Sequence, residues 1–329
     1  MNRVNRLGPA PLHADGRVWR ETNCYTDVWI EVLHELQHEP IAMLGPCVRV
    51  TLEADQWTFF KPSFDDLYLL YRCEVVETNP WRGLLATCES AVASGRIAIP
   101  EVDSWFLPDT AGVSYRLAHV KSSIAVLSID AARRQLSYAH NAGCHELRGD
   151  DFDGLFGQGA HELDATHLPP YVDMCTPSDT PRRSITDLAD CAFDLLRRDI
   201  PRLGTRNPFI VWTERFSDEL DAVRAGGDDA FHAYAFTTFR QFGPAFELAA
   251  THLAWMAEHT GAPRAAKDVL SAAAGHFTTI ASTALVFQMR TARAVMSGKP
   301  IDPTAWSTSL ADDWQAGVDL VRTLASAAQ

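Results

Sequence analysis

The stretch Asn23-Cys24-Tyr25-Thr26-Asp27-Val28-Trp29 opens the most strongly patterned segment of the chain. From Val28 onward, apolar residues recur three and four positions apart, which predicts a helix with one buried face that runs to about His38. Asn23 can cap this helix, so that Cys24 lies in its first turn, where the helix dipole and unpaired N–H groups favour a thiolate or an oxyanion. Because an isolated cysteine is more often a packing residue, the hypothesis of a nucleophile depends on partners further along the chain.

The composition is that of a soluble globular protein. Hydrophobic residues make up 47 % and charged residues 22 % of 329 residues, which is enough for two domains. A net charge of −13 argues against nucleic acid or an anionic membrane as the main partner. Seven cysteines without a CxxC pair indicate reduced thiols rather than a zinc site, and we expect no bound metal or cofactor. We find no signal-peptide core and no apolar run of about eighteen residues, so we expect a cytoplasmic protein without a membrane span.

The chain divides into two halves of different character, and the predicted fold class is α+β. We expect a catalytic domain over residues 1–160, a linker over 161–182 and an α-helical bundle or cap over 183–329. In the first half we predict helices and strands in the order helix after Cys24, strand 47–52, helix 63–71, helix 81–94, strand 95–103, strand 118–130, strand 135–141 and a short helix near 149–156. In the second half we predict helices over 184–198, 208–224, 228–259 with a break near Gly243-Pro244, 263–295 and 303–328.

Two candidate partners for Cys24 lie at the open ends of a predicted hairpin that turns at residues 130–134. A hairpin brings its open ends together, so that His119 and Asn141 can be neighbours. In a Cys-His-Asn triad, the histidine takes the thiol proton and the asparagine orients the imidazole through its other nitrogen. We therefore predict Cys24, His119 and Asn141 as catalytic residues. In a regular strand His140 points to the opposite face from Asn141, although a bulge could exchange their roles.

Residues 20–156 resemble the papain-like, C39-peptidase-like domain of butirosin-type acyltransferases. In that family a cysteine opens the central helix, a strand ending in Asp and a proline-containing loop precede the histidine strand, and a hairpin ends in Asp or Asn. The matching segments are Asn23-Cys24-Tyr25, EVDSWFLP at 101–108, HVKSSI at 119–124 and HNAG at 140–143. The sequence departs from the family at Ala118, where a glycine is usual, and it lacks a glutamine six residues before Cys24, so the second oxyanion donor is not identified.

The whole chain is also similar to an uncharacterised bacterial family known only as a domain of unknown function. The motifs that carry this similarity are DQWTFFKP at 55–62, EVDSWFLPDTAG at 101–112 and FHAYAFTTFRQFGPAFELA at 231–249. The similarity spans both halves of the chain and implies no particular activity.

Six further side chains are candidates for substrate binding: Asn23, Trp57, Asp103, His140, Arg240 and Gln241. Trp57 fits either a pocket wall or the core, and Asp103 either shapes the site or caps a turn. Arg240 and Gln241 lie within an apolar helical pattern, where polar groups need partners from each other or from a substrate.

The butirosin-type resemblance implies an acyltransferase. Cys24 would accept an acyl or aminoacyl group from the phosphopantetheine thioester of a carrier protein and pass it to a small-molecule amine. An acidic carrier would need a local basic patch on a chain of this charge. Two alternatives stay open, namely a papain-like peptidase or amidohydrolase, and a non-catalytic binding protein of the same fold. Reaction of Cys24 with an electrophile separates the binding protein from the enzymes, and product analysis with an amine separates transferase from hydrolase.

Overall fold

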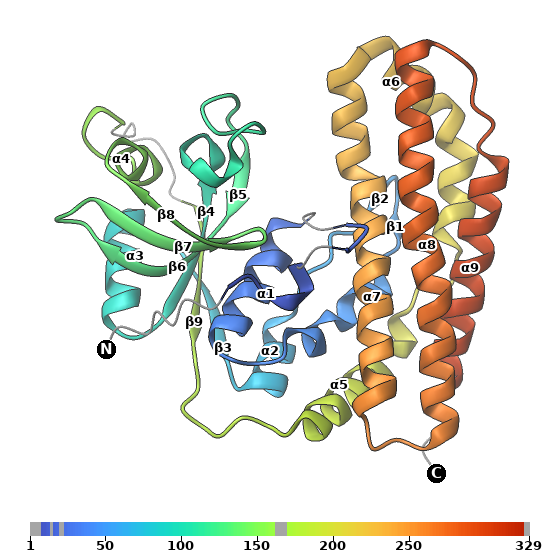
Figure 1. The fold of residues 1–329 in the computed structure, drawn as a ribbon, viewed down its shortest axis with the longest axis horizontal. Helices are drawn as coiled ribbons and strands as arrows, with labels where there is room; N and C mark the ends of the chain where they lie inside the picture. Colours follow the sequence, from blue (N-terminus) through green and yellow to red (C-terminus); the bar gives the residue numbers. More distant parts are fainter. Residues whose placement is uncertain (1–7, 14–15, 20–22, 162–169, 326–329) are drawn as a thin grey trace. The chain divides into compact units, whose positions relative to one another are not determined.

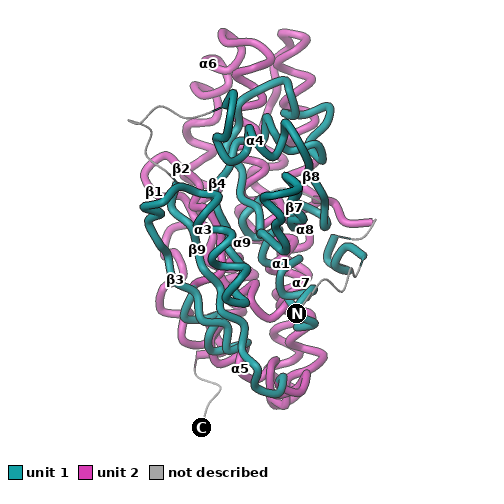
Figure 2. Tube along the Cα trace, turned by 90° about the vertical axis from the view of Figure 1, so that its left-hand side faces the viewer, with its two compact units in different colours: residues 1–15, 23–40, 64–182 teal, residues 16–22, 41–63, 183–329 magenta. Residues whose placement is uncertain are grey.

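The computed structural model describes residues 8–13, 16–19, 23–161 and 170–325, which fall into two compact units (Figure 2). The first unit contains residues 1–15, 23–40 and 64–182, and the second contains residues 16–22, 41–63 and 183–329. Both units are therefore discontinuous in sequence. The segment 41–63, which we assigned to the first domain, groups with the helical half of the chain.

The first unit is built on an antiparallel sheet with the strand order β3-β9-β4-β6-β7-β8, and β5 pairs with β4 (Figure 1). The strands are β3 (Glu74–Thr78), β4 (Ile97–Asp103), β5 (Lys121–Ser123), β6 (Ala125–Asp130), β7 (Gln135–His140), β8 (Gly143–Arg148) and β9 (Val172–Thr176). The helices are η1 (Pro11–His13), α1 (Cys24–Glu35), α2 (Phe64–Tyr71), α3 (Leu84–Ala93), η3 (Ser104–Phe106), η4 (Pro108–Thr110), α4 (Asp150–Phe156) and η5 (Gly159–His161). Strand β9 lies within the segment 161–182, for which we predicted a linker. The sequence did not reveal this strand because its five residues show no clear periodicity.

Helix α1 begins as the sequence predicts and ends at Glu35, three residues earlier than expected. It covers one face of the sheet. The hydroxyl of Tyr25 donates to Asp173 of β9 at 2.6 Å, and at the other end of the helix Glu35 lies 3.8 Å from Cys144 of β8. Because side chains alternate along a strand, Asp173 and Cys144 identify the sheet face on which α1 packs.

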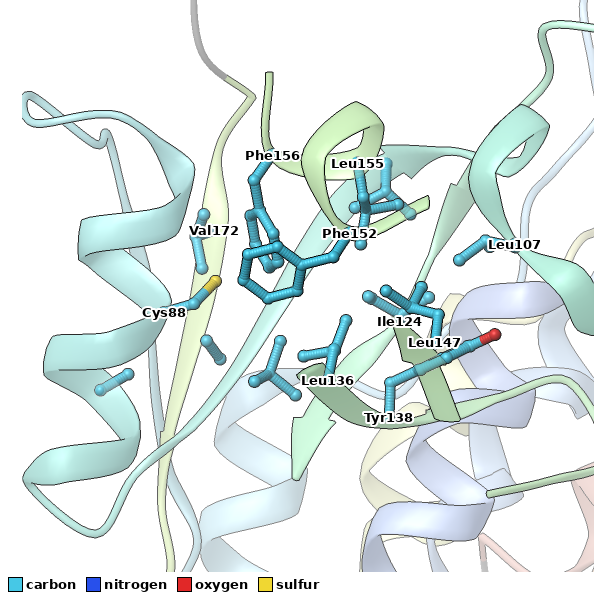
Figure 3. Packing of buried hydrophobic residues seen from close by; sticks show 14 residues of the cluster. Cys88, Leu107, Ile124, Leu136, Tyr138, Leu147, Phe152, Leu155, Phe156 and Val172 are labelled. Carbon is cyan, nitrogen blue, oxygen red and sulfur yellow. The ribbon is translucent and has the colours of Figure 1, made fainter. Parts of the chain in front are cut away.

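The opposite face of the sheet carries the hydrophobic core of the first unit, beneath α3 and α4. Figure 3 shows Phe152 of α4 and Cys88 of α3 pointing toward side chains of the strands, among them Leu136 and Tyr138 of β7. All four side chains are buried. Helices therefore cover both faces of this antiparallel sheet.

The predicted hairpin is confirmed in β6 and β7, but the run 118–130 is two strands rather than one. Ser122 of β5 is the partner of Val102 in β4, whereas Ala125 of β6 is the partner of Ala139 in β7. Between them, the N–H of Ile124 donates to a carbonyl of β4. Residues 121–123 are thus paired with β4 rather than with β7. This pairing determines which residues lie next to His119.

In its described residues, the second unit is helical apart from one small hairpin. Its elements are η2 (Pro40–Arg49), β1 (Leu52–Glu53), β2 (Gln56–Trp57), α5 (Ile185–Asp199), η6 (Ile200–Arg202), α6 (Pro208–Thr237), α7 (Phe239–His259), α8 (Arg264–Ser297) and α9 (Thr304–Thr323). The prediction of a strand over 47–52 was wrong except at its last residue, Leu52, which begins β1. Residues 47–49 instead end the 3-10 helix η2.

The predicted break at Gly243-Pro244 was also wrong, because α7 continues through both residues. The interruption lies at Thr238, where φ is −121° and ψ is −91°, between α6 and α7. Gly243 has a packing role. A methyl group on it would overlap the indole ring of Trp19, so glycine here makes room for an aromatic side chain.

Within the described part of the chain, α8 is one helix that is long and apolar enough to cross a membrane by length and composition. Its side chains Leu270, Phe277 and Phe287 are fully buried, and the helix packs against α7 and α9. The ring of Phe277 lies 5.2 Å from that of Phe246 in α7. This face of α8 is part of the core of the second unit.

Candidate functional site

Asn23 and Cys24 form the N-terminal end of α1, as the sequence predicts. The Asn23 side chain accepts a hydrogen bond from the N–H of Thr26 at 3.2 Å and is itself buried. Asn23 is therefore a helix cap, and its side-chain oxygen points at the backbone. Cys24 is partly exposed and its thiol is free of any disulfide. The first-turn position supplies the dipole and backbone N–H groups on which the nucleophile hypothesis rests.

His119 is held by Asp103 and by an aromatic ring. Its Nδ1 lies 2.6 Å from Oδ2 of Asp103, and its ring stacks on the indole of Trp105 with centroids 4.5 Å apart and 9° between planes. The other oxygen of Asp103 accepts the N–H of Trp105 at 3.0 Å, so this carboxylate caps a turn and binds the histidine at once. In the neutral tautomer that donates Nδ1–H to Asp103, Nε2 carries the lone pair.

The His119–Asp103 pair lies on the sheet face that α1 covers. Asp173, which binds Tyr25 of α1, is the register partner of Ile99 in β4. Asp103 follows Ile99 by four residues on the same strand and so points to the same face. The His119 side chain is 69 % exposed. Since α1 also packs against β5, the strand that follows His119, the nucleophile and base predicted from sequence share one face of the sheet.

Asn141 occupies the turn between β7 and β8 with a left-handed φ of +47°, a conformation that asparagine tolerates better than most residues. Among the hydrogen bonds of the described residues, none joins Asn141 to His119. The reason is the break at Ile124, which turns the chain before it toward β4. The carboxylate of Asp103 stands at the imidazole nitrogen that we had assigned to Asn141.

A second His–Asp pair, with a serine attached, lies on the other face of the sheet. Nε2 of His140 is 2.7 Å from Oγ of Ser122, and Nδ1 of His140 is 2.5 Å from Oδ2 of Asp109 in η4. His140 is 1 % exposed and Ser122 is 7 % exposed. Ser122 precedes Ile124, and His140 follows Tyr138, by two residues each, which places both on the face of the buried core.

Tyr138 completes this buried chain of hydrogen bonds, since its hydroxyl donates to Oδ1 of Asp109 at 2.5 Å. Burial acts to raise the pKa of Asp109, but the hydrogen bonds from His140 and Tyr138 outweigh it and hold the pKa below its usual value. Burial, together with the Asp109 charge, raises the pKa of Tyr138 well above its ordinary range. The carboxylate of Asp109 is therefore charged throughout the physiological range.

The three remaining predicted binding residues belong to the second unit. Trp57 is buried in an aromatic cluster, with its ring centroid 5.1 Å from that of Phe209 and 4.7 Å from that of Phe242. Arg240 is half-buried in the first turn of α7. Gln241 is buried and donates to the carbonyl of Phe236 at 3.1 Å, while its Oε1 has no hydrogen-bond partner among the described atoms.

Sequence reasoning missed Asp109 and Ser122. Asp109 stands in a connector between strands, where no periodic pattern marks it, and Ser122 is one of two adjacent serines. The alternation of Tyr138 and His140 on one strand was the available signal. Two polar side chains on a face that is otherwise apolar require a shared polar partner.

A cavity of about 420 Å³ lies at the far end of α1 from Cys24. Glu35, Cys144, His145 and Glu146 contribute its polar lining. A helix of twelve residues is about 18 Å long, so this cavity is separate from the site at the start of α1. Within the described ranges, no three His, Cys, Asp or Glu residues are grouped so that they could hold a metal ion.

Comparison with protein-family models shows to which family the chain belongs. Residues 8–176 match the family model described as the DUF1839 N-terminal domain, and residues 186–323 match the DUF1839 C-terminal domain. The chain belongs to the DUF1839 family. A search of curated proteins found no match. The N-terminal DUF1839 match includes residues 41–63, which pack with the helical unit, so the boundary between the two matches differs from that between the structural units.

Proposed function

We propose that the first unit is a papain-like acyl-transfer enzyme in which Cys24 is the nucleophile, His119 the general base and acid, and Asp103 the residue that orients His119. The observation that carries this proposal is the 2.6 Å hydrogen bond between His119 and Asp103 on the α1 side of the sheet. It supplies an oriented imidazole on a side chain that is 69 % exposed, and an oriented imidazole is the group that a thiol nucleophile at the start of α1 needs. The indole of Trp105 restricts rotation of the ring.

The proposed reaction has two half-steps. The Sγ–H proton of Cys24 passes to Nε2 of His119 as the sulfur attacks the carbonyl carbon of a thioester. Collapse of the tetrahedral intermediate breaks the bond to the donor sulfur, which leaves with the proton from His119, and acyl-Cys24 forms. An amine then attacks the acyl carbon, gives its proton to His119, and the Cys24 sulfur departs and is reprotonated. Asp103 stabilises the imidazolium in both half-steps.

The donor and acceptor follow from the resemblance to butirosin-type acyltransferases. The donor is the phosphopantetheine thioester of an acyl or aminoacyl carrier protein, and the acceptor is a small-molecule amine. Exchange between two thioesters changes free energy little, so the enzyme needs to lower a barrier rather than drive an uphill step. A peptidase or amidohydrolase of the same fold would use the same residues, with water in place of the amine.

Ser122 is a second candidate nucleophile, because the buried chain from Ser122 through His140 to Asp109 has the hydrogen-bond order of a Ser-His-Asp triad. The burial of Ser122 and His140 argues for a supporting role, since a substrate carbonyl must reach the nucleophile. The hydrogen bonds from Ser122 through His140 to Asp109 connect β5 to β7 and η4, and so hold β5, the strand that follows His119.

Intact-protein mass spectrometry after incubation with acyl- and aminoacyl-phosphopantetheine thioesters tests the proposal. We expect wild type to gain the acyl mass and Cys24→Ala to lose this gain, while Ser122→Ala and its neighbour control Ser123→Ala both retain it. Loss of loading in Ser122→Ala alone would assign the chemistry to the buried triad instead. Discharge by added amines indicates a transferase, and discharge by water alone indicates a hydrolase.

Absence of loading on wild type, together with an ordinary rate of Cys24 alkylation by iodoacetamide, would overturn the catalytic proposal. A non-catalytic binding protein would then be the better description of this fold.

A further inference from the structure

Three arginines of the second unit converge on one buried carboxylate. Asp199, whose side chain is 8 % exposed, lies at the end of α5. Its Oδ2 accepts Nη1 of Arg49 at 2.7 Å, and its Oδ1 accepts Nε of Arg198 at 2.9 Å and Nη1 of Arg202 at 3.5 Å. The three guanidinium groups come from η2, α5 and η6, so separate segments of chain are brought together at this point.

The cluster carries more positive charge than Asp199 neutralises. Among the residues that the structure describes, Asp199 is the only carboxylate within ion-pair distance of Arg49 or of Arg202. One negative charge is therefore shared by at least two cations. A carboxylate has about four acceptor positions, whereas each guanidinium has about five N–H donors, so most donors of Arg49 and Arg202 point elsewhere.

The remaining N–H donors of Arg49 and Arg202 face solvent, while the carboxylate and the loop that hold the two arginines are fixed by further contacts. The Arg49 and Arg202 side chains are 28 % and 61 % exposed, while Asp199 underneath is buried. The adjoining loop is tied down as well: Arg322 of α9 donates to the carbonyl of Gly204 at 2.6 Å, and Gly204 packs closely on Thr51. Desolvation works to raise the pKa of Asp199, but the arginines outweigh it and lower that pKa, so Asp199 stays charged and keeps the guanidinium groups in place.

We propose that the Arg49–Arg198–Arg202 cluster binds the phosphate group of a phosphomonoester. Planar guanidinium groups match phosphate oxygens with paired N–H donors, and the half-buried Arg49 and the exposed Arg202 share one carboxylate, Asp199. A surplus of positive charge at one fixed point contrasts with the net charge of −13 of the whole chain, so an anion gains more at this cluster than elsewhere on an acidic surface.

The test is a titration of the full-length protein with inorganic phosphate, at constant ionic strength set by chloride, followed by calorimetry and thermal unfolding. We expect saturable binding and a rise in unfolding temperature with phosphate. Arg202→Gln should weaken binding about tenfold, the loss of one charge-assisted contact. Arg264→Gln is the matched control, since Arg264 is an exposed arginine of the same unit, paired with Asp268, and should leave phosphate binding unchanged.

Two results would overturn the proposal: phosphate that acts no differently from chloride, or equal losses in Arg202→Gln and Arg264→Gln. Because Arg202 is largely exposed, its variant is expected to fold, and circular dichroism checks this. Glycerol 3-phosphate in solution and vesicles containing phosphatidate then distinguish the source of the phosphate. Binding of glycerol 3-phosphate supports a soluble metabolite, binding of vesicles alone supports a lipid headgroup, and failure of both rejects a phosphomonoester.

Discussion

Gly154 of α4 lies directly against the ring of Phe106 in η3, so closely that a methyl group on Gly154 would overlap three ring carbons. Gly154→Ala must displace this ring, and we expect it to destabilise the first unit by about 1–3 kcal/mol, the usual cost of overpacking. Urea unfolding measures the loss. Because Phe106 follows Trp105, the same variant is expected to loosen the stacking that holds His119.

Gly275→Ala provides the control for this substitution. Gly275 is in the interior of α8, and nothing lies within 4 Å of an added Cβ. We expect alanine there to stabilise the protein by up to about 1 kcal/mol through helix propensity. Equal destabilisation by both changes would show that contact with Phe106 is not the cause.

The buried His13 is expected to make the free energy of unfolding depend on pH between about 6.5 and 9. Its Nδ1 is 2.5 Å from Glu31 and its Nε2 is 3.2 Å from Asp27. Burial works against protonation, but the hydrogen bonds to Asp27 and Glu31 outweigh it and raise the pKa of His13 from 6.5 to about 9. The imidazolium therefore contributes stability that is fully present below pH 6.5 and is lost as pH rises through about 9.

Urea unfolding at pH 6 and at pH 9 measures this contribution. We expect wild type to lose stability between the two values, by an amount on the order of 3 kcal/mol if the full shift is realised. His13→Gln should be less stable at pH 6 and nearly flat up to pH 9. A wild-type protein that is equally stable at both pH values would contradict the assignment.

His252 in the second unit has the opposite dependence. Its Nδ1 donates to the carbonyl of Ile41 at 2.8 Å, its Nε2 has no hydrogen-bond partner among the described atoms, and burial lowers its pKa to about 4. The unfolded chain binds this proton first, so stability is full above pH 6.5 and is lost as pH falls toward about 4. The expected slope is about 1.4 kcal/mol per pH unit, and His252→Asn should remove it from denaturant curves collected over that range. An unchanged slope in the variant would assign the acid sensitivity to other groups.

Asp103 is predicted to act through His119 as a positioning residue. Asp103→Asn keeps the size of the side chain but removes the charge that stabilises the imidazolium, and the rate of acyl loading on Cys24 should fall by about 10²–10⁴-fold. Stopped-time mass spectrometry over a range of pH measures the rate, and the pH profile should move with the variant, which a purely structural effect would not produce. Asp130→Asn changes a surface carboxylate that binds Arg133 and serves as the control. Equal rates in Asp103→Asn and wild type would remove Asp103 from the proposed mechanism.

The elements that sequence predicted best are those fixed by local periodicity and capping. The start of α1 at Cys24, its cap Asn23 and the hairpin of β6 and β7 all follow from neighbouring residues. The break at Ile124 does not, because it depends on whether one stretch pairs with β4 or with β7, a choice between distant partners.

The same limit applies to the candidate site. Cys24 and His119 are predicted from residue type and order, whereas the hydrogen-bond partner of His119 depends on tertiary pairing. Asp103 was considered either as part of the site or as a turn cap, and its two oxygens allow both. The position of Asp109 beneath His140 could not be foreseen, since a connector has no repeating pattern that reports which way a side chain points.

The division of the chain into discontinuous units has a consequence for biosynthesis. Residues 41–63 leave the ribosome early, yet the rings that surround Trp57 belong to Phe209 and Phe242, which are translated much later. The helical unit therefore cannot close during synthesis of the first half, and the nascent chain carries Trp57 without these rings until α6 and α7 emerge. A split at residue 183 would divide the helical unit alone: the C-terminal product would lack residues 16–22 and 41–63, and the N-terminal product would carry Trp57 without the rings of Phe209 and Phe242.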